Sequence, residues 1–312
     1  MTKWMTIAAV IPEWKPDFLS LDDPIQLDDG VSLAEFPEWC RTSPMIDNLG
    51  LVARNRIRDE VRFALISSYE GGDAIGERHP WTIGGVRRSR QSVAREALNM
   101  ACLSMWIALP TGFSYQTVID ASERDGAWRV RAVGTYDPFL PNAWNMVRSH
   151  THVEVDAAAK LYRALKEVDR SSAVWTAIRT LWSSLAESQY VVRYLLTWVA
   201  LEALMGPRGG GELKFRIAQR LSLFLSDDRT GAQTRFAQLK EAYDLRSKIV
   251  HRGRPKMASK KAMSMLQLSE EALREALVKV LSDESLAATF STEKSRDDFL
   301  DSLVFAEKGG AI

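Results

Sequence analysis

The chain has 312 residues, of which 46% are hydrophobic and 26% are charged. This composition is ordinary for a globular protein, and the length predicts two domains or one large one. The formal net charge is only +1, because 41 lysines and arginines face 40 acidic residues, so bulk charge does not indicate a nucleic-acid partner.

Three features predict a cytoplasmic protein without a membrane partner. The cysteines, Cys40 and Cys102, are too few for a disulfide framework and fit a reducing compartment. The first residues lack the sustained apolar run of a signal peptide. The most apolar stretch, 190–205, is interrupted by Arg193 and Glu202, so it predicts a buried helix and not a membrane span.

Residues 1–150 predict an α+β domain. The first 50 residues are rich in Pro, Asp and Trp and predict short strands and turns, whereas 55–69 fits a helix or a strand. The glycine-containing stretch 71–76 predicts a loop. The basic and aromatic run 78–90 is interpreted as an exposed loop, with a nucleic-acid contact as the alternative.

A helix is expected at 92–109, directly before Pro110. Two alternating stretches, 115–121 and 128–136, predict the strands of a hairpin, because the segment 123–126 between them is typical of a tight turn. No motif assigns a role to this half of the chain.

The second half, 151–312, predicts a helical domain, because apolar side chains recur there at helical spacing. The expected helices span 154–168, 174–189, 190–205, 212–226, 236–254, 269–282 and 294–305. The helix 190–205 is apolar nearly all round, so we expect it at the centre of a bundle. The chain is therefore predicted to be mainly α-helical, with an N-terminal α+β domain.

One expected helix, 236–254, carries an unusual cation. Its apolar face is formed by Phe236, Leu239, Ala242, Tyr243, Ile249 and Val250. Arg246 falls near the middle of that face, where a guanidinium is costly unless it is paired or has a task. His251 follows at the helix end, where the helix dipole favours its protonated form, and Gly253 and Pro255 end the helix.

The run RSKIVH at 246–251 matches the R-x4-H motif of HEPN-domain ribonucleases. Together with the upstream segment WVALEALMG at 198–206, the wider run YDLRSKIVHRG resembles the Apea-like HEPN branch. The resemblance covers the C-terminal half and implies a HEPN-like helical bundle. It also implies RNA cleavage without metal or cofactor, in which Arg246 and His251 are the catalytic residues.

Glu202 is the expected partner of Arg246, because a carboxylate in an otherwise apolar helix is itself costly without one. One interpretation makes this pair purely structural. In the other, which the resemblance favours, Glu202 holds Arg246 while the guanidinium binds the scissile phosphate. Ser247 stands where the family often has Asn, Asp or His, although its hydroxyl can donate to a phosphate oxygen. Tyr243 is expected in the core or a dimer interface, with base stacking as the alternative.

His251 is one of four histidines. It is interpreted either as a helix cap or as the general base or acid for attack of a ribose 2′-hydroxyl on the adjacent phosphate. On an ideal helix, Arg246 and His251 lie roughly 140° apart, so one intact helix does not bring them together. The resemblance implies that two motif helices pair across a dimer two-fold, and we therefore expect a homodimer with a composite cleft.

Basic residues surround the motif. Between 240 and 261 there are eight, namely Lys240, Arg246, Lys248, Arg252, Arg254, Lys256, Lys260 and Lys261. Of these, Lys248, Arg252, Arg254 and Lys256 are the expected contacts of an RNA backbone. The alternative is a solvated helix end with favourable C-terminal cations.

Two other stretches are weaker candidates. His150 and His152 have strand spacing, but the ligand cluster of a metal site does not accompany them, so we expect a surface loop and no metal; Glu154 and Asp156 keep the metal alternative open. The stretch 206–211, GPRGGG, precedes a helix and suits an anion, but it lacks the lysine of a P-loop and is interpreted as a connector.

The resemblance implies an endoribonuclease that acts in antiphage defence or as a toxin, with RNA as its partner and an antitoxin or a phage-derived trigger as its regulator. Residues 1–150 are then expected to sense the trigger or select the substrate. Two alternatives stay open. One is a non-catalytic HEPN module that binds RNA, a nucleotide or a protein, and the other is a helical dimerisation scaffold.

Overall fold

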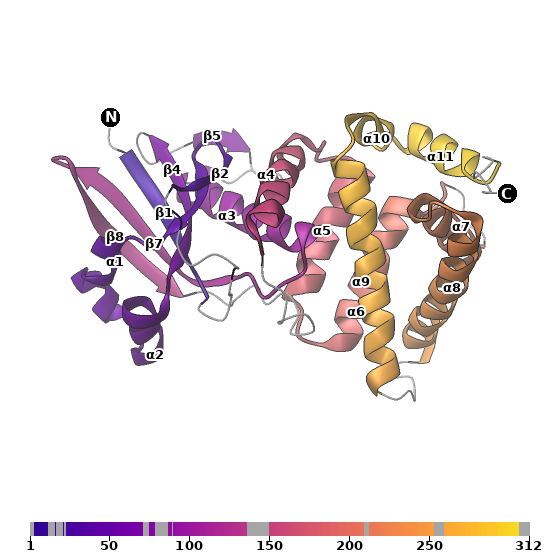
Figure 1. The fold of residues 1–312 in the computed structure, drawn as a ribbon, viewed down its shortest axis with the longest axis horizontal. Coiled ribbons are helices and arrows are strands. Elements are labelled where there is room, and N and C mark those ends of the chain that lie inside the picture. The colour runs from indigo at the N-terminus through magenta and orange to yellow at the C-terminus, as the bar shows by residue number, and fades with distance from the viewer. Residues whose placement is uncertain are drawn as a thin grey trace. The chain divides into compact units, whose positions relative to one another are not determined.

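The computed structural model describes residues 3–11, 16, 21, 23–70, 75–78, 87–88, 90–135, 150–208, 212–252 and 259–305. The chain divides into two compact units, Met1–Lys166 and Glu167–Ile312 (Figure 1). The first unit contains an antiparallel sheet and the second is helical. A mainly helical fold with an N-terminal α+β part is therefore confirmed.

The helix α4 (His152–Glu167) groups with the first unit, although the sequence predicted a division at residue 150. Its contacts with strand β2 explain this grouping. Arg163 donates to the carbonyl oxygen of Leu27 at 2.9 Å, and Lys166 forms an ion pair with Asp28.

The first unit is built on a six-stranded antiparallel sheet in the order β2-β3-β4-β1-β7-β8. Its strands are β1 (Lys3–Val10), β2 (Ile25–Asp28), β3 (Val31–Glu35), β4 (Phe63–Glu70), β7 (Tyr115–Arg124) and β8 (Ala127–Thr135). β7 and β8 form the predicted hairpin. The two turn residues, Asp125 and Gly126, have φ values of 56° and 76°, and positive φ at both positions matches the twist of the flanking strands.

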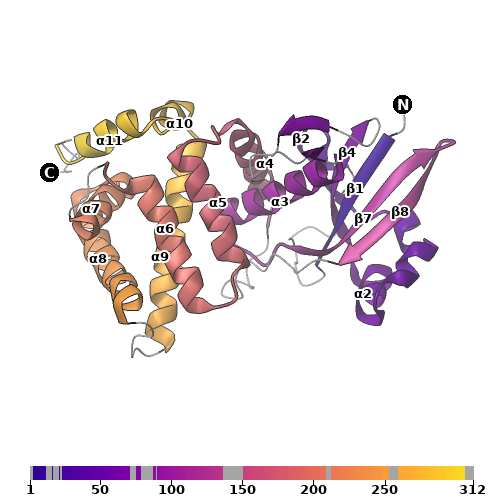
Figure 2. The same cartoon turned by 180° about the vertical axis from the view of Figure 1, so that it is seen from behind.

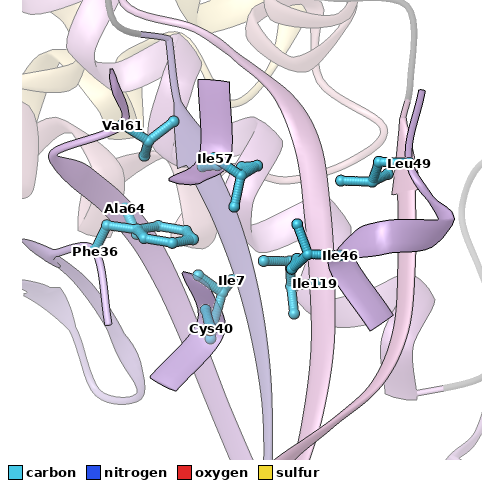
Figure 3. Packing of buried hydrophobic residues seen from close by; sticks show 10 residues of the cluster. Ile7, Phe36, Cys40, Ile46, Leu49, Ile57, Val61, Ala64 and Ile119 are labelled. Atoms are coloured by element: carbon cyan, nitrogen blue, oxygen red, sulfur yellow. The ribbon is translucent and has the colours of Figure 1, made fainter. Parts of the chain in front are cut away.

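One face of this sheet packs on four short helical segments (Figure 3). They are α1 (Glu38–Arg41), the 3-10 helix η1 (Pro44–Asn48), α2 (Leu51–Asn55) and the π-helix η2 (Arg56–Glu60). Ile7 of β1 and Ile119 of β7 share a fully buried cluster with Cys40, Ile46 and Ile57 of these segments. Removing these apolar side chains from water stabilises the unit.

The opposite face of the sheet carries polar side chains beside α3 (Arg90–Ala108). The Thr6 hydroxyl donates to Asp120 of β7 at 2.8 Å, and a guanidinium nitrogen of Arg95 lies 3.3 Å from the other oxygen of that carboxylate. Asp120 is buried, so these two contacts offset the cost of removing its charge from water.

The second unit is a bundle in which α6 is central, as the sequence predicted. Its helices are α5 (Ala173–Ala186), α6 (Tyr190–Met205), α7 (Leu213–Leu225), α8 (Arg229–Arg252), α9 (Ser259–Leu281), α10 (Glu284–Thr289) and α11 (Glu293–Ser302). α6 packs against α5, α7, α8 and α9, and α7 lies beside α8 (Figure 2). Among the described helices, none combines the length and the apolar character that a membrane-spanning helix needs.

The C-terminal end of α6 is anchored by two buried arginines. Arg296 donates to the carbonyl oxygens of Ala203 and Gly206 at 2.8 and 3.1 Å, and Arg220 donates to that of Met205 at 3.1 Å. The last carbonyls of a helix lack intrahelical partners. These contacts therefore satisfy the end of the helix that carries Glu202.

Several elements differ from expectation. α8 and α9 begin at Arg229 and Ser259, earlier than predicted, and α10 was not predicted. Gly76, expected in a loop, lies in the strand β5 (Ile75–Arg78), which pairs with β6 (Arg87–Arg88). Within residues 79–90, only β6 and Arg90, the first residue of α3, belong to the described part of the chain.

Candidate functional site

The candidate site is built on the C-terminal half of α8. The inner face of this helix is formed by Leu239, Ala242, Leu245 and Ile249, which are all buried. Arg246 lies among them in the sequence, yet 24% of its side chain stays exposed. The guanidinium is therefore at the edge of the core and not inside it. Val250, which was expected on the buried face, is exposed.

Glu202 of α6 is the partner of Arg246, as expected. Nη2 of Arg246 lies 2.9 Å from Oε1 of Glu202 and donates a hydrogen bond to Oε2 at 3.2 Å. The Glu202 side chain is exposed to the same extent as that of Arg246. Nε of Arg246 is buried and makes no hydrogen bond to any described residue. The guanidinium is thus oriented by one carboxylate but retains donor capacity.

An aromatic pair supports the guanidinium from the core side. The guanidinium carbon of Arg246 lies 5.4 Å from the ring centroid of Tyr243, within the range of a cation–π contact. Tyr243 is buried and meets Trp198 of α6 edge to face, with centroids 5.1 Å apart. Burial raises the pKa of the Tyr243 hydroxyl, the charge of Glu202 raises it further, and Arg246 opposes them. Tyr243 is therefore a core residue, which is one of the two locations expected for it.

His251 is exposed near the end of α8. The helix continues through Arg252, so its last turn does not unwind before His251. Arg246 and His251 therefore keep their separation of roughly 140° around the helix axis. The fold does not bring the two predicted catalytic side chains together within one chain.

The expected RNA contacts are only partly described. Lys248 is exposed and Ser247 is half-buried. The side chain of Arg252 and the whole of Arg254 and Lys256 lie outside the described residues, as do Gly253 and Pro255, the expected helix stop. Their predicted roles stay predictions.

Other cations near the motif differ in their surroundings. Nζ of Lys261 lies 2.5 Å from Oε1 of Glu241, so that charge is compensated. Lys248 and Lys260 are exposed and form no ion pair with the described residues. The positive charge that remains available to a polyanion is therefore smaller than the sequence count indicated.

His150, expected on a surface loop, is instead fully buried in the first unit. Its Nε2 lies 3.2 Å from the carbonyl oxygen of Met105, and its Nδ1 lies 3.3 Å from the hydroxyl of Thr111. Because a carbonyl only accepts, Nε2 carries the proton and Nδ1 accepts from Thr111. Burial lowers the pKa of this imidazole. His152 is exposed, and the described residues contain no cluster of three or more His, Cys, Asp or Glu suited to a metal.

An aromatic pair on the outer side of α8 was not expected from the sequence. Phe215 of α7 meets Phe236 of α8 edge to face, with centroids 5.3 Å apart. Nζ of Lys240 lies 5.1 Å from the centroid of the Phe236 ring. The spacing of Phe236 and Lys240 by one helical turn is the only sequence signal for this arrangement, because Phe215 comes from another helix.

Comparisons with models of known protein families, with curated proteins and with solved structures gave no significant match. Membership of a family is therefore not shown, and the chemistry available to α8 follows from its own side chains.

Proposed function

We propose that the protein is a metal-independent endoribonuclease of the HEPN class that acts in antiphage defence or as a toxin. Two observations support this proposal. The run 246–251 matches the R-x4-H motif, and Arg246 is oriented by Glu202 and Tyr243 while its side chain stays 24% exposed.

The exposure of Arg246 is the observation that carries the proposal. The arginines that hold the second unit together, Arg193, Arg220 and Arg296, have side chains that are at most 7% exposed. Arg246 is oriented like them but stays open to solvent. A guanidinium that is both positioned and accessible suits the binding of a phosphate, because its planar fork matches two phosphate oxygens.

The proposed chemistry divides the work between two side chains. Arg246 binds the scissile phosphate and stabilises the charge that develops on its oxygens. His251 takes the proton of the ribose 2′-hydroxyl, whose oxygen attacks phosphorus while the bond to the 5′-oxygen breaks. The departing 5′-oxygen takes up a proton from water, and His251 later returns its proton to the solvent, so the products are a 2′,3′-cyclic phosphate and a 5′-hydroxyl.

A second copy of the chain would complete the site. Arg246 and His251 diverge on α8, so a composite site needs the His251 of one chain beside the Arg246 of another. Val199, one turn before Glu202, and Val250, one turn after Arg246, are both exposed. Apolar side chains that flank the ion pair on both helices suit a surface covered by a partner.

The remaining basic residues and the first unit have supporting roles in this proposal. Lys248, Arg252, Arg254 and Lys256 neutralise phosphates of the bound strand. Residues 1–150 detect a phage-derived trigger or select the RNA, and an antitoxin is the alternative regulator.

A non-catalytic module that binds RNA, a nucleotide or a protein is the second candidate. The ion pair between Glu202 and Arg246 favours this candidate, because the carboxylate already takes up part of the hydrogen-bonding capacity of the guanidinium. This candidate predicts retention of RNA without turnover.

The test is RNA cleavage by the purified protein in EDTA. We expect the wild type to cleave and Arg246→Ala and His251→Ala each to lower the rate by roughly 10²- to 10⁴-fold, the range typical for loss of an acid–base or charge-stabilising group. Arg235→Ala is the matched control. Arg235 is also on α8, has a side chain that is 29% exposed and forms an ion pair with Glu275 at 2.6 Å.

Four results would contradict the proposal. Cleavage that requires added metal, or that survives both substitutions, argues against this chemistry. Retained RNA without products favours the binding module. A melting temperature that falls for Arg246→Ala but not for Arg235→Ala favours a structural role for the pair with Glu202.

A further inference from the structure

One flank of α8 carries a stripe of side chains that are exposed or half-buried. Phe236, Lys240, Ser247 and His251 follow one another at intervals of four, seven and four residues, which places them on the same side of the helix. His251 is exposed and the other three are half-buried. The stripe spans roughly 22 Å from Phe236 to His251 at 1.5 Å per residue.

The far end of this stripe carries an exposed aromatic ring. Phe215 of α7 is 42% exposed, although it follows a helix start and nothing in the local sequence requires an aromatic there. Its contact with Phe236 is edge to face, so Phe236 covers at most one face of the Phe215 ring and leaves the other face free of that partner. A large apolar ring left open to solvent is a feature that a packed helix pair does not need.

The charges along the stripe suit an anionic strand. Lys240 stands over the Phe236 ring, and its ammonium group forms no ion pair with a described residue. The carboxylate nearest the stripe belongs to Asp244, which is compensated by Lys214 at 2.8 Å. Lys248 on the adjoining side of α8 is exposed. The available charge is therefore positive, and it runs between the aromatic ring and His251.

We propose that this stripe is the track of a single RNA strand and that Phe215 stacks on a base at the end distant from the scissile phosphate. The inference rests on the proposed function for the direction of the strand, but the binding itself does not require turnover. Proteins hold single strands without reading their sequence by combining positive charge along the backbone with aromatic rings on which bases stack, because every base has a π-face. The site thus takes unpaired RNA and not a duplex, whose bases are not available for stacking.

The test is binding of an uncleavable strand to the full-length protein. A 2′-O-methyl oligonucleotide of about twelve nucleotides, within the roughly 4–16 that such surfaces occupy, is followed by fluorescence anisotropy. We expect Phe215→Ala to weaken binding about 5- to 100-fold, as typical for loss of one stacked base. Phe215→Leu should behave like Phe215→Ala, because it restores apolar volume but no flat face, whereas Phe215→Trp should retain the affinity.

The control is Phe305→Ala, which removes an exposed aromatic side chain that follows α11 in the second unit. Equal affinity of Phe215→Ala and the wild type would overturn the proposal and leave the exposed ring as a contact for a protein. Full affinity of Phe215→Leu would overturn stacking as the cause. A blunt-ended duplex of the same length that binds as tightly as the single strand would overturn the substrate class. If the strand binds through Phe215 but RNA is not cleaved, the proposed catalysis fails and this inference stands. The two proposals can therefore fail separately.

Discussion

At the level of single residues, the exposure of Arg246 decides how its pairing with Glu202 is to be understood. An ion pair whose partners are each about a quarter exposed is screened by water and contributes at most about 1 kcal/mol to stability. A phosphate can therefore replace the carboxylate at little cost. We therefore expect the fold to tolerate the removal of Arg246, so that its chemical role can be examined separately.

His150 is predicted to make the stability of the protein depend on pH. Burial lowers the pKa of its imidazole below the ordinary value of 6.5. Between these two values the unfolded chain binds the proton and the folded chain does not, so protonation favours unfolding. The contribution of His150 is present in full above pH 6.5, is lost as the pH falls below 6.5, and levels off below the folded pKa. Urea unfolding between about pH 7.5 and about pH 5.5 measures this loss.

Two substitutions test the assignment to this imidazole. His150→Gln should flatten the pH dependence and, by leaving Thr111 or the Met105 carbonyl unpaired, lower the free energy of unfolding at neutral pH by roughly 1–3 kcal/mol. His152→Gln changes an exposed histidine two residues away and is the control for the substitution itself. A His150→Gln protein with the wild-type pH profile would show that another group titrates.

At the level of helices, α6 depends on a buried charge pair with α9. Nε of Arg193 lies 2.6 Å from Oε1 of Glu270, and both side chains are buried. Burial raises the pKa of the Glu270 carboxyl, against the opposing effect of Arg193. Removing one partner leaves the other charge buried and uncompensated, so we expect Glu270→Ala to lower the free energy of unfolding by roughly 3–5 kcal/mol. Urea unfolding checks this value.

The double substitution Arg193→Met/Glu270→Leu separates an uncompensated charge from a lost attraction. If desolvation dominates, this apolar pair should unfold near the wild-type urea concentration, since well-packed apolar residues often replace a buried ion pair without loss. Additive destabilisation in the double variant would contradict that explanation. Glu241→Ala, which removes the exposed partner of Lys261, should change the free energy of unfolding by less than about 1 kcal/mol.

How well each helix could be predicted followed from its length and its periodicity. The bounds of α6 match the prediction, because an apolar run between polar turns defines both ends. α10 has six residues, too few for a periodic signal, and its start depends on the Asp283 side chain, which accepts from the backbone of Ser285 and Leu286. β5 was not predicted because it is short and contains a glycine, a residue that is rare in strands. It is recognised as a strand only by its pairing with β6.

The same limits apply to the site. Glu202 was predictable as the partner of Arg246, because a lone carboxylate in an apolar helix requires one. The burial of His150 was not, since its partners Thr111 and Met105 lie about forty residues away along the chain. The contact between Phe215 and Phe236 was not predictable either, because the two rings come from different helices, α7 and α8.

At the level of the whole molecule, the proposed catalysis depends on an assembly, because one α8 cannot present Arg246 and His251 to the same phosphate. A composite site makes a prediction that no single-chain site shares. In a dimer that combines an Arg246→Ala chain with a His251→Ala chain, one of the two sites loses both groups and the other retains both. Two inactive proteins should therefore regain activity when their chains are mixed.

Random exchange of the two variants at equal concentration gives mixed dimers in half of the population, each with one intact site, so roughly a quarter of the wild-type cleavage rate should return. The mixture is denatured, refolded together and assayed on RNA in EDTA, and sedimentation of the wild type verifies that it is dimeric. Pairing Arg246→Ala with an Arg246→Ala/His251→Ala chain is the matched control and should stay inactive, because no site then contains Arg246. If the first mixture also stays inactive although mixed dimers form, each chain must use its own Arg246 and His251, and α8 would have to unwind beyond Arg246 in the active state.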